Sequence, residues 1–183
     1  MTQVLVPIAD GSEEMEAVIT IDVLRRAGAE VTVASVMKNP LITASRSVVI
    51  QADTTIDNCV STPWDLIALP GGLPGAEHLS NNKSLLALVK QQHEKQRWLA
   101  AICAAPAVVL GRHGLLEGFK ATCHPGFQAE LAGYAEVSKD RVVLDRHLIT
   151  SQAPGTAIEY ALTLVECLWG PDKRAEVATP MVV

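Results

Sequence analysis

Residues 98–110 read WLAAICAAPAVVL, and this stretch predicts a strand, a sharp turn and a helix in immediate succession. An apolar run of strand length ends at Cys103, and helix-forming residues follow it, with Pro106 in the first turn. Such a junction lifts a nucleophile out of a parallel sheet and points free amide N–H groups at it. We therefore expect a lowered pKa for the Cys103 thiol and an oxyanion site beside it. The alternative is a cysteine that is merely buried in the core.

The composition predicts one α/β domain over residues 1–183. Hydrophobic residues make up 49% of the chain and charged residues 19%, which is typical of a globular protein with a sizeable core. The net charge is −5, and the sequence contains no run of Lys and Arg that would form a basic patch. Nucleic acids and anionic membranes select basic surfaces, so neither is expected as a partner.

The sequence shows no recognisable targeting or membrane segment. Residues 1–8 lack the basic flank of a signal peptide, and no apolar run approaches the roughly 20 residues of a membrane helix. The four cysteines are widely spaced, which does not suggest a disulfide framework; they are Cys59, Cys103, Cys123 and Cys167. A reduced, cytoplasmic location is the expectation.

The first part of the chain predicts a βαβ unit. Residues 4–8 form an apolar strand, an amphipathic helix runs to Arg26, and residues 30–36 alternate as a second strand. Because βαβ units place their strands in parallel, the sheet of this single α/β domain is expected to be parallel. A further buried strand is expected at Leu66–Leu69.

Two strand ends are expected to meet at one edge of this sheet. Gly71 and Gly72 follow the strand at Leu66–Leu69, and adjacent glycines let the backbone approach a ligand closely. An ordinary tight turn is the alternative for this pair. Cys103 ends the next strand, and open α/β folds place their sites along the carboxyl edge of the sheet.

A thiol nucleophile needs a proton acceptor, and the sequence offers two kinds. His124 follows a predicted strand, which sets it apart from the other histidines, although a structural role is the alternative. Glu13, Glu14 and Glu16 follow the first strand and could reach the same edge as Cys103. A carboxyl buried beside a thiolate would have a raised pKa and could act as acid or base. Complementing the helix dipole is the alternative for all three.

No metal or cofactor is expected. Cys103, Cys123 and His124 lack the Cys-x-x-Cys or His-x-x-x-His spacing that metal ligands adopt. The stretch at residues 151–156 precedes the last predicted helix, where it could hold an anion or simply cap the helix.

Four motifs, taken together, resemble the ThiJ/PfpI superfamily over nearly the whole chain. They are GSEEME at residues 11–16, LPGG at 69–72, AICAAP at 101–106 and TSQAPGT at 150–156. The similarity is greatest to the branch of the parkinsonism-associated protein deglycase and its bacterial relatives. It implies a flavodoxin-like three-layer sandwich, with a mostly parallel sheet and helices on both faces, that assembles as a homodimer.

The resemblance also implies roles for four residues of the reactive centre. Cys103 matches the family's nucleophilic, oxidation-sensitive cysteine, and Glu16 matches the glutamate that hydrogen-bonds it. Gly72 and Ala104 match the backbone amides of the oxyanion site.

Three more residues match less central positions, and two positions depart from the family pattern. His124 falls where many members carry a nearby histidine, and Arg26 and Arg46 match arginines near the dimer interface and the substrate.

Ala104 stands where the protease-like branch has a histidine, which argues against a peptidase. Ala44 stands where some members carry a second, peripheral cysteine.

The activity that this branch implies is cofactor-independent detoxification of reactive dicarbonyls or their adducts in stress response. Such an enzyme is a glutathione-independent glyoxalase or a protein deglycase, in which Cys103 adds to the aldehyde and Glu16 moves a proton. Its substrates would be small dicarbonyls or glycated proteins. An alternative of another class is a redox-regulated chaperone or oxidative-stress sensor that uses the same cysteine. A cysteine peptidase is the third possibility.

Overall fold

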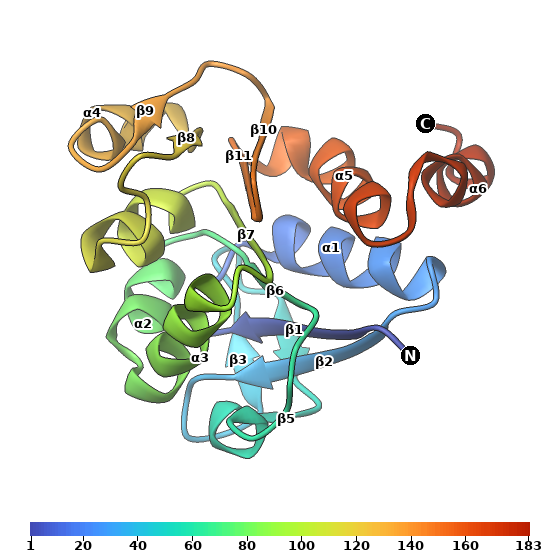
Figure 1. Cartoon of the computed structure of the whole chain (residues 1–183). Coiled ribbons are helices and arrows are strands. Elements are labelled where there is room, and N and C mark those ends of the chain that lie inside the picture. Colours follow the sequence, from blue (N-terminus) through green and yellow to red (C-terminus); the bar gives the residue numbers. More distant parts are fainter.

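The computed structural model describes all residues 1–183, and a seven-stranded sheet runs through its centre (Figure 1). All neighbouring strands pair in parallel except the edge hairpin β10–β11. The strands in sheet order are β10 (Val142–Asp145), β11 (Leu148–Ser151), β7 (Trp98–Ile102), β6 (Leu66–Leu69), β1 (Gln3–Ile8), β2 (Glu30–Ser35) and β5 (Thr54–Thr55).

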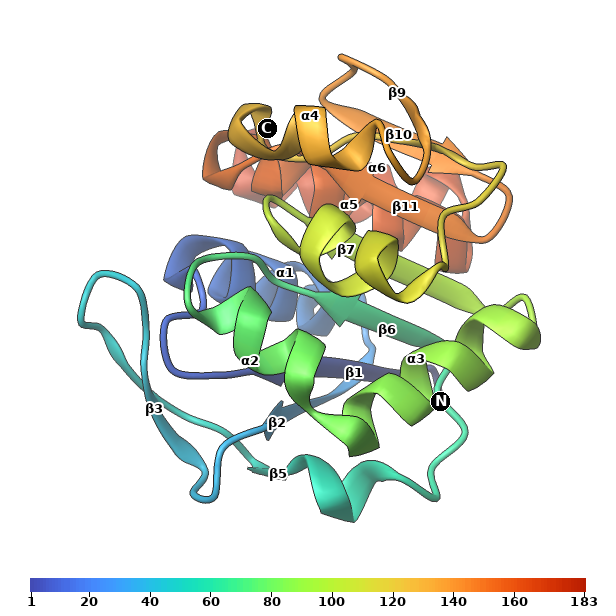
Figure 2. The ribbon, with the colours of Figure 1, turned by 90° about the vertical axis from the view of Figure 1, so that its left-hand side faces the viewer.

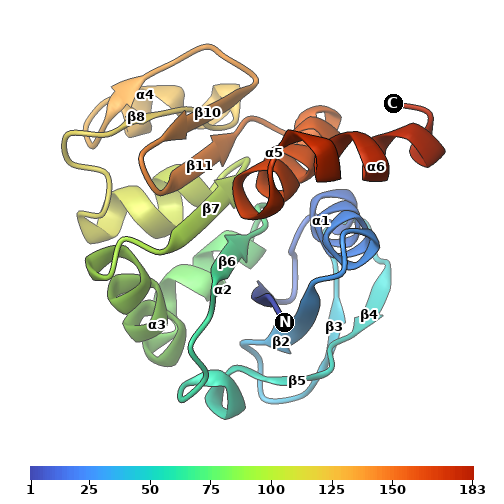
Figure 3. The ribbon, with the colours of Figure 1, turned by 45° about the vertical axis from the view of Figure 1, so that its right-hand side comes forward.

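Helices cover both faces of this sheet. Figure 2 shows the helices of one face in front of the strands, and Figure 3 shows those of the other face lying together. The first face carries α2 (Gly75–Asn81) and α3 (Lys83–Glu94). The second face carries α1 (Glu14–Arg26), α5 (Ala157–Trp169) and α6 (Pro171–Met181). The expected three-layer α/β sandwich of the flavodoxin-like type is confirmed.

The alternation of side chains along each strand explains why two cores form. In β1, Val4 and Val6 pack with α1 and α5, whereas Leu5 between them packs with α2 and α3. Successive side chains of a strand point to opposite faces, so an apolar strand with no polar member must be covered on both. The near-continuous apolar runs at β1, β6 and β7 therefore require helices on both faces.

Smaller elements complete the fold at the edges. The expected hairpin excursion beside the sheet is present as β3 (Leu41–Thr43) paired with β4 (Val49–Gln51). A short parallel pair, β8 (Lys120–Ala121) and β9 (Glu136–Val137), flanks α4 (Gln128–Leu131). No helix is both long and apolar enough to cross a membrane.

The parallel register brings the carboxyl ends of four strands to one edge. β1, β6, β7 and β11 are neighbours in the sheet and point the same way, so the loops that follow them converge. The loops after β1, β6 and β7 carry the three motifs that contain Glu16, Gly72 and Cys103. The expectation that these strand ends meet is confirmed by the strand order.

Candidate active site

Cys103 lies at the end of β7 with a strained backbone. Its φ of +66° is in the left-handed region, which costs a non-glycine residue roughly 1–3 kcal/mol. Both of its backbone groups are held: its N–H donates to the Ser151 carbonyl at 3.0 Å, and its carbonyl accepts the His124 N–H at 2.8 Å. Neighbouring strand ends thus hold Cys103 in the conformation that turns its side chain out of the sheet.

Two backbone amides face the Cys103 sulfur. The N–H groups of Gly72 and Ala104 hydrogen-bond toward it and oppose the rise of its pKa. Gly72 has a φ of +85°, and a Cβ there would lie 2.4 Å from the Glu13 nitrogen, so no side chain fits. The helix expected after Cys103 begins as a π-helical turn over Pro106–Leu110. The amides predicted to hold an oxyanion therefore lie at the nucleophile.

Glu16 is fully buried in the first turn of α1, against the nucleophile. Its Oε2 accepts the Gly71 N–H at 2.8 Å, while Oε1 has no hydrogen-bond partner. A Cβ on Gly71 would lie 2.5 Å from the Cys103 Cβ and 2.9 Å from Glu16 Oε2. Glycine at position 71 therefore lets the carboxyl and the thiol lie next to each other.

Burial shifts the pKa values of both groups upward, and the charge of Glu16 adds to the shift of the Cys103 thiol. Burial raises the pKa of Glu16 to about 7, against the hydrogen bond from Gly71. Burial and the charge of Glu16 raise the pKa of the Cys103 thiol to about 12. The expected lowering of the thiol pKa is therefore wrong: Cys103 is only 9% exposed, and the carboxylate beside it outweighs the two amides. Above pH about 7 the pair therefore carries one negative charge and one transferable proton.

The neighbouring glutamates have separate structural tasks. Glu13 caps α1, because its Oε2 accepts the Glu16 N–H at 2.8 Å. Glu14 accepts the Ser45 hydroxyl at 2.6 Å and the Arg46 N–H at 2.7 Å. Burial opposes ionisation of Glu14, but these hydrogen bonds outweigh it and lower its pKa. Glu14 thereby ties the β3–β4 turn to the helix that carries Glu16.

A pocket of about 360 Å³ opens over Cys103. His124 lies on its wall and caps the turn that follows, because its Nδ1 accepts the Gly126 N–H at 3.0 Å. In the neutral ring the proton is therefore on Nε2, which makes that nitrogen a donor. Arg46 also lines the pocket, and its guanidinium donates to the Ser45 carbonyl at 3.2 Å. Cys103, Gly72, Ala104, His124 and Arg46 are thus brought together.

Arg26 is not brought into this pocket. It ends α1, about 15 Å along the helix axis from Glu16, and it is paired with Asp22 at 2.5 Å on the surface. The pocket instead contains three residues that sequence reasoning missed, Ser45, Leu73 and Phe127, together with Glu13 and Pro154 from stretches that it had considered. Each is within three residues of a motif or a predicted site residue, and this proximity is the one signal that could have suggested them.

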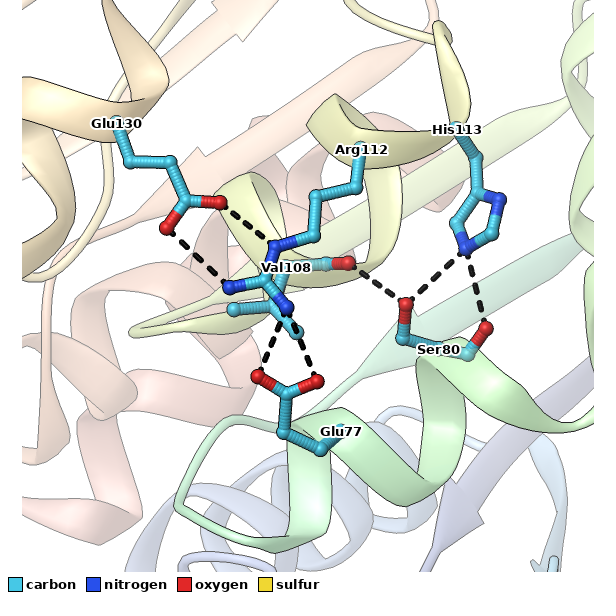
Figure 4. Close-up of polar contacts among 6 residues, drawn as sticks. All are labelled: Glu77, Ser80, Val108, Arg112, His113 and Glu130. Carbon is cyan, nitrogen blue, oxygen red and sulfur yellow. Dashed lines mark hydrogen bonds and ion pairs between the residues drawn. The ribbon is translucent and has the colours of Figure 1, made fainter.

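Arg112 ties together three segments that follow site residues (Figure 4). Its guanidinium donates to both carboxylate oxygens of Glu77 on α2, at 2.8 and 3.0 Å. It also donates to both oxygens of Glu130 on α4, at 2.7 and 3.3 Å. The segment after Cys103 is thereby fixed to α2, which follows Gly72, and to α4, which follows His124.

A second contact fastens the same segment (Figure 4). The Ser80 hydroxyl donates to the Val108 carbonyl at 2.9 Å, inside the π-helical turn. His113 Nε2 lies 3.0 Å from the Ser80 hydroxyl and 3.1 Å from the Ser80 carbonyl. Because the hydroxyl proton is directed to Val108, Ser80 is not an activated nucleophile, and we assign the contact to structure.

No cluster of three or more His, Cys, Asp and Glu side chains could hold a metal ion. The site thus consists of a thiol at a strained strand end, a buried carboxyl beside it and two amides aimed at the sulfur. A sandwich with this arrangement at its carboxyl edge defines a class of cysteine-centred α/β proteins.

The DJ-1/PfpI family model matches residues 2–167, and the chain belongs to this family. The Parkinson disease protein 7 homolog of Danio rerio is 41% identical, over 98% of this chain and 96% of that protein. The structure of oxidized Toxoplasma gondii DJ-1 superposes with a TM-score of 0.96 at 43% identity, covering 100% of this chain and 98% of that one.

Of two further relatives, one is much longer than this chain and the other carries the name of an enzyme. Protein DJ-1 homolog B of Arabidopsis thaliana is 49% identical over 99% of this chain, but the chain spans only 41% of that protein. A Caenorhabditis elegans protein named as a glutathione-independent glyoxalase is 34% identical, over 97% of this chain and 94% of that protein.

The Arg112 contacts predict a specific effect of their loss. Arg112→Gln should lower the free energy of unfolding by about 1 kcal/mol, and it should also reduce the reactivity of Cys103 toward alkylation, because α2 and α4 are released. Thermal unfolding and alkylation rates measure the two effects. Arg174→Gln is the control, since Arg174 is similarly exposed and pairs with Glu166 away from the site. Equal alkylation rates in the two variants would contradict a link between Arg112 and the site.

Proposed function

We propose that the protein is a cofactor-independent cysteine enzyme that converts α-oxoaldehydes to hydroxy acids, with deglycation as the same chemistry on an adduct. The observation that carries this proposal is the buried Glu16 carboxyl beside Cys103, with the Gly72 and Ala104 amides on the sulfur. A carboxyl whose pKa is raised to about 7 can both take and give a proton near neutrality. The name of the Caenorhabditis elegans relative supports this reaction class.

The first step with methylglyoxal forms a hemithioacetal. The Glu16 carboxylate takes the thiol proton while the sulfur forms a bond to the aldehyde carbon, C1. The electron pair of the C1–oxygen double bond moves to that oxygen, where the amides of Gly72 and Ala104 can donate to it. Glu16 then returns the proton to the oxygen and is again a carboxylate. Activating the thiol in this way does not require a low thiol pKa.

The second step is an internal transfer between the two carbons, followed by hydrolysis. Glu16 takes the C1 proton and delivers it to the former ketone carbon, while the hydroxyl proton moves from one substrate oxygen to the other. The product is a thioester on Cys103. Water adds to its carbonyl, the carbon–sulfur bond breaks, and lactate leaves as sulfur regains a proton. Methylglyoxal and water give lactate with no external oxidant or reductant.

Two side chains that line the pocket can bind the substrate oxygens. The Nε2–H of His124 and the guanidinium of Arg46 are donors that can hold the ketone oxygen or the product carboxylate. Substrates are small dicarbonyls or glycated proteins. A cytoplasmic location agrees with four cysteines that form no disulfide.

A redox-regulated chaperone or stress sensor is the second candidate, favoured by one observation. The Toxoplasma gondii relative is described as oxidized. A sensor cysteine is exposed and acidic, whereas Cys103 is nearly buried and its pKa is raised. The enzyme therefore remains our first choice. A peptidase ranks third, because Ala104 supplies no imidazole beside the nucleophile.

The decisive test is lactate production from methylglyoxal by chelator-treated protein. Cys103→Ser should abolish it while the fold persists, because the change is nearly isosteric. Cys167→Ser, which alters a cysteine outside the pocket, should retain it. If the wild type instead shows no turnover while mass spectrometry detects peroxide oxidation of Cys103, the enzyme hypothesis is rejected and the stress sensor is favoured.

We further propose that two copies of the chain form a homodimer through α1 and the β3–β4 hairpin. Met15 and Val18 on α1 expose large apolar side chains, and Leu41, Val48 and Val49 on the neighbouring hairpin do the same. Figure 3 shows the hairpin beside α1. Soluble monomers rarely expose contiguous apolar patches of this kind. The hairpin turn carries Arg46, so the interface would border the pocket.

Light scattering should give twice the 19.5 kDa mass of one chain. Val49→Asp should shift the mass toward the monomer, because it places a charge in the apolar contact. Val60→Asp, at a similarly exposed valine outside α1 and the hairpin, should remain dimeric. A monomeric wild type at micromolar concentration would exclude the dimer.

A further inference from the structure

Part of the lining of the pocket over Cys103 is apolar, and nothing in the mechanism above uses it. It consists of Leu73, Phe127 and Pro154, which we call the apolar wall. Leu73 is 50% exposed and directly follows Gly72, so the oxyanion loop itself presents an aliphatic side chain to solvent. An exposed large apolar side chain next to a reactive group is more informative than one elsewhere on the surface.

The other members of the wall are held by the site. Phe127 ends a short 3-10 turn that His124 organises: the His124 carbonyl accepts the Phe127 N–H at 2.8 Å, and His124 Nδ1 accepts the Gly126 N–H at 3.0 Å. Phe127 also packs against the core on the α2–α3 face. Pro154 opens another 3-10 turn after β11. The position of the apolar wall is therefore fixed relative to the nucleophile.

The other side chains that line the pocket include polar groups, and most of these groups are occupied by contacts within the chain. Glu13 caps α1 and Ser45 donates to Glu14. The donors of Arg46 and His124 remain for substrate oxygens. Because Glu16 closes the buried side of the sulfur, a substrate bonded to Cys103 extends into the pocket, where its oxygens can meet these donors and its carbon substituent can contact the apolar wall.

The size of the pocket exceeds what the simplest substrate needs. About 360 Å³ lies within the range of pockets that enclose drug-sized ligands, whereas methylglyoxal has only five heavy atoms. Its single methyl group would leave most of the apolar wall in contact with water. A larger apolar substituent would displace that water from Leu73 and Phe127.

We propose that the pocket selects α-oxoaldehydes whose ketone carries a bulky apolar group, either aryl or branched alkyl. This inference rests on the proposed function and specifies its substrate class. Each added methylene that fills an apolar pocket is worth roughly 10-fold or more in kcat/KM. Leu73 and Phe127 are the specificity-determining residues, and Glu16 and Cys103 perform the same chemistry on every substrate.

The experiment compares kcat/KM for phenylglyoxal, isopropylglyoxal and methylglyoxal. The wild type should prefer both bulky substrates to methylglyoxal by about 10-fold or more. Leu73→Asn and Phe127→Ser should each reduce the ratio of kcat/KM for a bulky substrate to kcat/KM for methylglyoxal several-fold. Damage to folding or to the nucleophile would lower both values and so cancels in this ratio. Isopropylglyoxal separates apolarity from aromatic stacking, because it has no ring.

Leu144→Asn is the matched control. Leu144 is 53% exposed and lies on β10, outside the pocket, so this variant should keep the wild-type ratio. If methylglyoxal is consumed but the ratio is unchanged in Leu73→Asn and Phe127→Ser, the selectivity of the apolar wall is refuted and the proposed function stands. If the wild type consumes none of the three aldehydes, the proposed function fails, and the inference fails with it.

Discussion

The contact between a buried carboxyl and a thiol at a strand end is the constraint on which the rest of the site depends. Glu16 and Cys103 come from different elements, α1 and the end of β7, and Gly71 at the end of β6 is the spacer between them. A side chain at position 71 would push them apart. The strand order places β6 between β1 and β7, so the sheet topology itself brings the pair together.

Maintaining this contact costs free energy, which the surrounding structure offsets. Cys103 has a left-handed backbone, and Glu16 is removed from water with one oxygen unpartnered. Hydrogen bonds to Ser151 and His124 hold the strained residue, and the Arg112 contacts fix the segment behind it. Local strain and perturbed pKa values gather where chemistry takes place, so these costs are physical grounds for assigning the function here.

The sequence predicted the parallel strands and their converging ends, because apolar runs and βαβ connections are local signals, whereas the three layers were expected from the family resemblance. It did not separate Glu16 from Glu13 and Glu14, since all three share one helical turn and only tertiary packing distinguishes them; the family resemblance was needed. It also predicted the wrong direction for the pKa of Cys103. The dipole argument counted the amides, whereas burial and the Glu16 charge become visible only in three dimensions. The sequence predicted a helix after Cys103, but nothing in the local sequence indicated the π-helical turn at Pro106–Leu110.

The central claim is that Glu16 and Cys103 act as one proton-sharing pair, and the pH dependence of Cys103 alkylation tests it without assuming a substrate. Below pH about 7 both groups are protonated; above it, the ionised Glu16 can take the thiol proton. The rate in the wild type should therefore rise with a midpoint near pH 7, and that step should vanish in Glu16→Gln. An identical midpoint in Glu16→Gln, or a wild-type rate with no step near pH 7, would contradict the account.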